Sequence, residues 1–178
     1  MISVTTELAA REQSLCAYVG SLTGTIEAKR QQLDEAGIFT AYADIYTAYL
    51  SAYQSTTEDS ERLEILKRLA FLSWYGMLEP SFISGIEEMS EVGIRTTYVW
   101  LDEYVRGQKL DDELQWMLSF YASWDFFLLP FIEPQLPALA SFIGTVDSTT
   151  FHVPENPIPW YAMDNRGQMG LYWQSIRV

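Results

Sequence analysis

Apolar residues recur every three or four positions along most of the chain, a spacing that places them on one face of an α-helix. Glycine, proline and small polar residues interrupt this pattern at points where helices commonly begin or end. The helices predicted in this way cover residues 6–19, 25–36, 38–54, 61–78, 80–89, 91–106, 111–129 and 137–142. We therefore expect an all-α fold, an irregular helical bundle of six to eight helices.

The pattern changes in the C-terminal segment, where proline, threonine and asparagine become frequent and the helical period is lost. Closely spaced prolines favour an extended path there, because proline cannot continue a helix. The aromatic residues around Asn165 and Gly167 indicate two short strands joined by a turn, since both residues tolerate a positive φ. We predict that residues 144–178 form an extended or β-hairpin strap over a helical body of residues 1–143. A strap that also closes one side of a binding cleft is the alternative.

The length of 178 residues favours a single domain with a core of its own. The one cysteine, Cys16, cannot form an internal disulfide, and the first residues show no signal-peptide pattern, so we expect a cytoplasmic protein. The most apolar stretch, residues 116–144, contains Asp125, Glu133 and three prolines. These interruptions favour a buried part of the core over a membrane span.

Two segments of the chain resemble each other, FLSWYGMLEP at residues 71–80 and YASWDFFLLP at residues 121–130. Their offset is close to the period of HEAT-like helical repeats, which is about 40–47 residues. Stacked repeats need at least three copies, and the sequence has no third. An αα-hairpin built twice on the same plan, or chance, therefore explains the similarity better than a solenoid does.

The formal net charge is −13, and the acidic residues are spread along the chain. Neither Lys nor Arg occurs in residues 31–61, which hold six acidic residues, or in residues 110–165, which hold eight. A field of this sign repels phosphate backbones and anionic lipids, so binding to nucleic acid or to a membrane is disfavoured. The charge permits a basic protein partner, although solubility alone also explains it.

Few residues could support metal or nucleophilic chemistry. Zinc and ferritin-like sites need several Cys or His ligands, whereas the chain has only Cys16 and His152. The sequence contains no G-x-S-x-G serine motif and no phosphate-binding P-loop. We therefore predict no metal and no cofactor. Cys16 is expected to be a small buried residue and His152 a structural hydrogen-bonding group, with a Cys–His catalytic pair as the alternative.

Three carboxylates, Glu79, Asp125 and Glu133, lie in strongly apolar sequence surroundings. Burial would raise their pKa values and could make one of them a general acid. The alternative is structural, because a carboxylate directly before Pro80 or Pro134 can accept a backbone N–H of the following helix. The structural interpretation is favoured, which makes an enzyme the weaker prediction.

The most regular feature is a stripe of aromatic residues within the helix predicted over residues 38–54. The stripe starts at Phe39 and continues at intervals of +3, +4, +3 and +4, so its members lie on one face of the helix. The four that follow are tyrosines, namely Tyr42, Tyr46, Tyr49 and Tyr53. The stripe is either a buried core seam or a contact face, because tyrosine is favoured in protein-binding hot spots.

From these observations we predict a non-enzymatic, acidic interaction protein that binds a basic protein partner, as an immunity or inhibitor protein does. The alternative is an enzyme or small-ligand binder with a Tyr/Trp-lined pocket and buried carboxylates. The predicted binding residues are the four tyrosines and two acidic triplets that we expect to be exposed, Glu58, Asp59 and Glu61 in a loop and Asp111, Asp112 and Glu113 at a helix start. The helix dipole also favours acidic residues in a first turn, so both triplets have a second explanation.

Overall fold

The computed structural model describes residues 3–124, 135–146 and 160–176. Within these ranges the chain forms nine α-helices and one short 3-10 helix, and no strand is present there. The elements in chain order are α1 (Val4–Ser21), α2 (Ile26–Glu35), α3 (Ile38–Ser55), α4 (Asp59–Leu78), α5 (Ser81–Ser84), α6 (Glu91–Arg106), α7 (Asp112–Ala122), α9 (Pro137–Gly144), η2 (Trp160–Met163) and α10 (Gly167–Ser175). The all-α prediction is confirmed, with one helix more than the expected range.

Most helices lie where the apolar period places them, and one is much shorter. The helix predicted over residues 80–89 ends after a single turn as α5, because Gly85 adopts a left-handed conformation with φ 75°. A Cβ atom at Gly85 would come within 2.8 Å of the Tyr42 ring and 2.9 Å of Val19. The chain therefore needs glycine here both for its backbone conformation and for close packing against α1 and α3.

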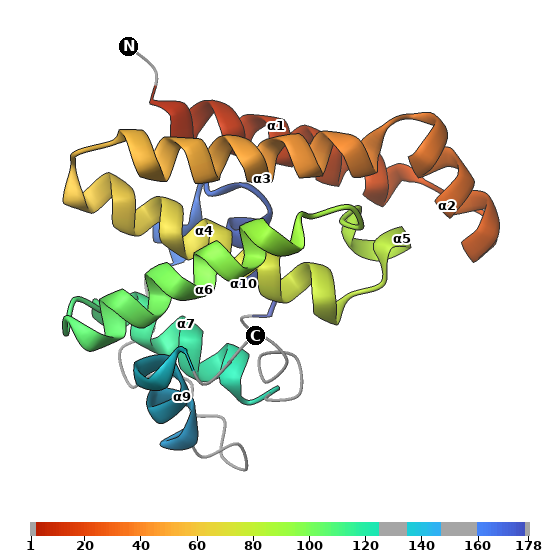
Figure 1. The fold of residues 1–178 in the computed structure, drawn as a ribbon. Coiled ribbons are helices and arrows are strands. Elements are labelled where there is room, and N and C mark those ends of the chain that lie inside the picture. The colour runs from red at the N-terminus through yellow and green to blue at the C-terminus, as the bar shows by residue number, and fades with distance from the viewer. Residues whose placement is uncertain (1–2, 125–134, 147–159, 177–178) are drawn as a thin grey trace.

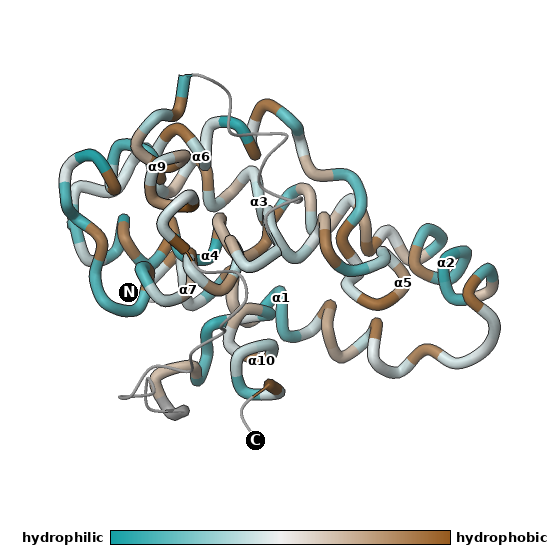
Figure 2. Tube along the Cα trace, turned by 90° about the horizontal axis from the view of Figure 1, so that it is seen from below, coloured by the Kyte–Doolittle hydropathy of each residue, from teal (hydrophilic) through white to brown (hydrophobic). Residues whose placement is uncertain are grey.

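Each helix packs against the next across the molecule, from α1 at one edge to α9 at the other. α1 and α3 lie side by side along one edge, and α7 and α9 lie at the opposite edge (Figure 1). Between these edges α4 packs against α3 and α6, and α6 packs against α9. Along most helices hydrophobic and hydrophilic positions alternate within each turn, as expected for helices with one buried face (Figure 2).

The resemblance between residues 71–80 and 121–130 does not extend to equivalent positions in the fold. Trp74 is fully buried, whereas its counterpart Trp124 is 42% exposed. Residues 125–130 lie outside the described residues. The HEAT-like arrangement is therefore not confirmed.

The C-terminal segment is helical in the part that the structure describes, so the β-hairpin prediction is wrong for α10. Asn165 and Gly167 do have the positive φ expected of a turn, 59° and 62°, but they join η2 to α10. Met169 and Trp173, four positions apart and both 0% exposed, form the buried face of α10. Tyr172 and Trp173, which suggested a strand, therefore lie on a helix. Residues 147–159, with His152, lie outside the described residues.

α10 packs against α1 and α4, and its tryptophan enters the core. The Trp173 ring lies 4.3 Å from that of Trp116 on α7, and Trp74 on α4 stacks on Tyr121 of α7 at 4.6 Å. Buried aromatic rings of this size dominate core energetics. The described part of the C-terminal segment thus packs aromatic side chains against the helical body, and a helix carries them in place of the predicted strap.

Asp102 fixes the start of α9 from the neighbouring helix α6. It is 1% exposed, and its Oδ1 accepts the backbone N–H groups of Ala138 at 2.8 Å and Leu139 at 2.9 Å. Pro137 occupies the first helical position, so Ala138 and Leu139 lie in the first turn of α9. Backbone N–H groups of a first turn have no acceptor inside their own helix. Arg106 forms an ion pair with the same carboxylate. A buried side chain of α6 thus serves as the cap of α9.

We expect Asp102→Ala to lower the free energy of unfolding by about 1–3 kcal/mol, because it leaves the buried N–H of Leu139 and the half-buried N–H of Ala138 without their acceptor. Asp102→Asn keeps an acceptor oxygen and should lose less. Glu103→Gln, at an exposed position of the same helix, is the control and should leave stability unchanged. Urea unfolding measures the three variants, and equal stability of Asp102→Ala and wild type would contradict the capping role.

Candidate functional site

The aromatic stripe of α3 lies in the core. Tyr42, Tyr46, Tyr49 and Tyr53 are each 0–2% exposed. This is the geometry of a core seam. The four tyrosines, which were predicted to bind a partner, expose almost no surface that a partner could contact.

The hydroxyl groups of the stripe connect α3 to its neighbours. The Tyr42 hydroxyl lies 3.2 Å from the Cys16 sulfur on α1. The Tyr46 hydroxyl lies 2.7 Å from that of Ser73 on α4 and 2.8 Å from that of Thr97 on α6. Burial raises the pKa of Tyr46 to about 12, so the hydroxyl stays protonated. The stripe therefore positions three helices through hydrogen bonds made inside the core.

A buried carboxylate on α1 receives the next hydroxyl of the stripe. Glu12 is 1% exposed, and its two oxygens accept the Tyr49 hydroxyl at 2.5 Å and the backbone N–H of Gln168 at 2.9 Å. Burial raises the pKa of Glu12 to about 6, and its hydrogen bonds and Arg68 limit this rise. Glu12 therefore joins the N-terminal helix, α3 and the start of α10.

Arg68 extends the contact from Tyr49 to α4. Its guanidinium donates to the Tyr49 hydroxyl at 3.0 Å and to the backbone oxygen of Thr5 at 2.9 Å. It also donates to Glu64, one turn away on α4, at 2.8 Å. Arg68 is 4% exposed, and these partners compensate the cost of burying its charge.

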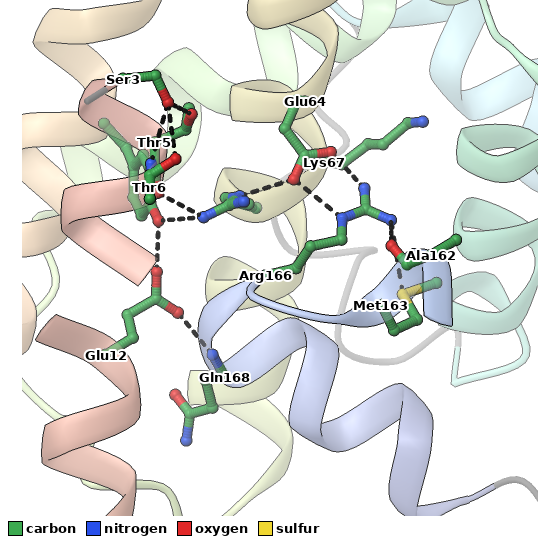
Figure 3. A network of polar contacts seen from close by, with 12 residues as sticks. Ser3, Thr5, Thr6, Glu12, Glu64, Lys67, Ala162, Met163, Arg166 and Gln168 are labelled. Carbon is green, nitrogen blue, oxygen red and sulfur yellow. Dashed lines mark hydrogen bonds and ion pairs between the residues drawn. The ribbon is translucent and has the colours of Figure 1, made fainter. Parts of the chain in front are cut away.

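Arg166 connects Glu64 to α7, and Figure 3 shows the contact of its guanidinium with Glu64. Its guanidinium donates to Glu64 at 2.9 Å and to Glu113 at 2.5 and 3.1 Å. Glu113 also forms an ion pair with Lys67, which donates to Asp111 at 2.6 Å. A series of alternating acidic and basic side chains thus runs from α1 to α7, with the Tyr49 hydroxyl between Glu12 and Arg68.

Gly167, between Arg166 and Gln168, brings the C-terminal turn against Glu12 of α1. Its φ of 62° is left-handed, and a Cβ atom would lie 2.6 Å from the Glu12 carboxyl carbon. No larger residue fits between the turn and Glu12 without displacing the carboxylate. The series from Glu12 to Asp111, with this turn, is called the ion network below.

The two acidic triplets differ in their surroundings. Glu58 and Asp59 are exposed, and the half-buried Glu61 accepts the Thr56 hydroxyl at 3.0 Å. In the other triplet Asp112 is exposed, but the side chain of Glu113 is only 16% exposed. The expectation of exposure is therefore wrong for Glu113.

Asp111 of the second triplet has a structural role in addition to its ion pair. Its carboxylate accepts the backbone N–H of Leu114 at 2.8 Å and so caps α7. Burial raises the pKa of Glu113, but hydrogen bonds from Arg166 and Lys67 outweigh this effect and hold the pKa below its usual value. The helix-start explanation therefore accounts for Asp111, and the ion network accounts for Glu113.

The remaining candidates for chemistry have unreactive surroundings or lie outside the described residues. Burial raises the pKa of Cys16 to about 11, which keeps it a thiol at neutral pH. Glu79 is half-buried at the end of α4, and α5 has no side-chain cap. Its predicted capping role is therefore not observed. Asp125, Glu133 and His152 lie outside the described residues.

Sequence reasoning named Asp111 and Glu113 only as exposed binding residues, and it missed the other residues of the ion network. Glu12 occupies a position where the apolar period of α1, from Leu8 to Val19, calls for an apolar side chain. Arg166 directly follows the long stretch without Lys or Arg. A lone charge in either setting is a signal of burial with a partner.

Two hollows open on the surface of the described helices. One, of about 450 Å³, lies between α2 and the segment after α5, and four carboxylates and one guanidinium line it. The other, of about 230 Å³, lies among α1, α4, α5 and α10, and the described residues that line it are uncharged. They are called the acidic groove and the apolar hollow below.

Comparisons with protein-family models, with curated proteins and with solved structures give no match. In the part of the chain that the structure covers, no cluster of three His, Cys, Asp or Glu residues could hold a metal ion. None of the described helices is both long and apolar enough to cross a membrane. The side chains alone must therefore support any functional conclusion.

We expect Glu12→Gln to change how stability depends on pH. The pKa of Glu12 is higher in the folded chain than its usual 4.5, so the stability that this group contributes falls as pH rises from about 4.5 to about 6. Glutamine cannot ionise, yet it keeps an oxygen for the Gln168 N–H. The difference in unfolding free energy between the variant and wild type should therefore shift in favour of the variant, by roughly 2 kcal/mol, between pH 4.5 and neutral pH. Urea unfolding at both pH values measures this difference. Glu7→Gln, at an exposed position of α1, should show no such change, and a pH-independent difference for Glu12→Gln would refute the expectation.

Charge reversal should separate the two triplets. Glu113→Lys places a third cation beside Lys67 and Arg166 and is expected to cost about 3–5 kcal/mol of unfolding free energy. Reversing the exposed Glu58 or Asp59 should change stability by less than about 0.5 kcal/mol. Thermal and urea unfolding compare the variants. A Glu113→Lys protein as stable as the Glu58→Lys protein would show that the ion network does not hold α7.

Proposed function

We propose that this chain is a non-enzymatic binding protein for a basic protein partner, and that the acidic groove is where the partner's cationic side chains bind. The observation that carries the proposal is the lining of the groove. Glu27 and Asp34 come from α2, and Glu87 and Glu88 come from the segment after α5. Among the described residues of the lining, Arg30 is the one basic residue, so these residues give the groove an excess of negative charge.

The carboxylates of the groove are accessible. Glu27, Asp34, Glu87 and Glu88 are exposed, in contrast to the buried acids of the ion network. Hydrogen bonds from its own backbone N–H and from Thr25 lower the pKa of Glu27, which keeps it ionised. A Lys or Arg side chain could enter this groove with little loss of hydration for the carboxylates.

Arg30 occupies a place in the groove that a cation of the partner can take over. Its exposed guanidinium pairs with Glu87 across the groove. Exposed ion pairs of this kind contribute little to stability, commonly about 0–1 kcal/mol. A cation of the bound partner could therefore replace Arg30 at small cost, while the net charge of −13 speeds the encounter.

The surroundings of the titratable groups support binding without turnover. The buried carboxylates of the ion network are already paired with cations or backbone donors, and Cys16 remains a thiol. The second candidate function, a small-ligand binder with an aromatic pocket, is favoured by the apolar hollow beside Tyr75 and Tyr172. The cytoplasmic location remains a prediction.

The test is binding of a fluorescent peptide rich in Lys and Arg, followed by fluorescence anisotropy at low and physiological salt. We expect Asp34→Asn/Glu88→Gln to weaken binding about three- to tenfold at low salt, with a smaller effect as screening increases. Asp44→Asn/Glu103→Gln removes the same charge from exposed positions outside the groove. This control should weaken binding less than about twofold.

The controls distinguish a site from a general charge effect. Equal losses in the two double variants would mean that net charge alone attracts the peptide, which contradicts a role for the groove. Absence of binding to the basic peptide at low salt would contradict the proposed function itself. Circular dichroism should show the same helix content for both variants, since the substituted side chains are exposed.

A further inference from the structure

The apolar hollow is built where four helices meet. Cys16 and Gly20 of α1, Tyr75 of α4, and Leu171 and Tyr172 of α10 contribute to its lining. A dry cavity of about 150 Å³ can already hold benzene. The volume of about 230 Å³ therefore suits a molecule of one ring or of two fused rings.

One of the residues that line this hollow carries a buried acceptor without a partner. Gln168 is 7% exposed and lines it, and its side-chain nitrogen donates to the backbone oxygen of Ser84 at 2.8 Å. That hydrogen bond fixes the orientation of the amide. The Oε1 atom of Gln168 is buried and accepts no hydrogen bond. An unpaired buried acceptor costs about 1–3 kcal/mol, so a ligand that donates to it would remove this cost.

The lining selects for an uncharged ligand. The described residues around the hollow include no acidic or basic side chain. Burial raises the pKa values of Cys16 to about 11 and of Tyr75 to about 12, so both stay neutral at physiological pH. A charged ligand would lose hydration without gaining an ion pair. Aromatic rings beside the mouth, with Tyr75 and Tyr172 centroids 5.2 Å apart, favour a flat aromatic ligand.

We propose that the apolar hollow binds a small neutral aromatic molecule that donates one N–H or O–H group to the Oε1 atom of Gln168. The site shares no lining residue with the acidic groove. It does not depend on the proposed binding of a basic partner.

The experiment titrates the full chain with indole and with benzothiophene, which has the same ring size but no N–H. Methyl ¹H–¹³C spectra report on Leu171 and Ile83, which line the hollow and are 43% and 49% exposed. We expect indole to shift both methyl signals and to bind about fivefold or more tightly than benzothiophene, as one hydrogen bond implies. Equal affinities would overturn the role of Gln168, and no shift of either signal with millimolar indole would overturn the site.

Two glycine variants locate the binding. A Cβ atom at Gly20 or at Gly144 would meet no atom within 4 Å, so leucine fits at both positions. Gly20→Leu fills the hollow and should abolish the indole shifts, whereas Gly144→Leu, on α9, should leave them unchanged. Unchanged indole affinity in Gly20→Leu overturns the proposal. If that variant does not fold, Leu171→Glu replaces it, because this exposed rim residue would bring a charge to the mouth. Indole binding should then weaken at least fivefold, and unchanged affinity would likewise overturn the site.

Discussion

The rest of the structure depends on the salt bridges of Arg166, which join α4 and α7 to the C-terminal turn. Glu64 and Glu113 each accept two hydrogen bonds from this one guanidinium, a geometry that arginine offers and lysine does not. The free energy lost when these charges leave water is about as large as the free energy gained from their attraction. The salt bridges therefore determine how the helices are arranged more than how stable the fold is. Arg166 determines where α10 starts, and α10 determines where Trp173 enters the core.

The same turn explains how a charged series and a close-packed core coexist. Gly167 allows the backbone to lie directly against the Glu12 carboxylate, and Gln168 donates its N–H to it. The carboxylate thus receives both a backbone donor and the Tyr49 hydroxyl, which is how a buried charge is tolerated. The tyrosines of α3 combine ring burial with hydrogen bonding in the same way, and this is why a stripe that looks like a contact surface lies inside the molecule.

The sequence predicted the local parts of this fold and missed the long-range ones. Helices α1 to α4, α6, α7 and α9 follow from apolar spacing and caps, because both signals lie within a few residues of each other. The turn at Asn165 and Gly167 was also predicted, but the helix after it depends on burial of Met169 and Trp173, which a single segment does not reveal. Glu12 and Gln168 are 156 positions apart, and Arg166 and Glu64 are 102 apart. No spacing rule joins residues at such distances, so neither the ion network nor the hollow beside Gln168 could be predicted.

The distribution of charge between interior and surface supports the proposed binding role. The ion network contains four acidic side chains, Glu12, Glu64, Asp111 and Glu113, and three basic ones, Lys67, Arg68 and Arg166. Its charges nearly cancel, so holding the helices together requires almost none of the net −13. The excess of acidic residues therefore belongs to the remaining positions, where it adds repulsion within the folded chain and a field around it. A basic partner would relieve that repulsion on binding, and the acidic groove, with several carboxylates on two neighbouring segments, is a place where one cation could approach several of them at once.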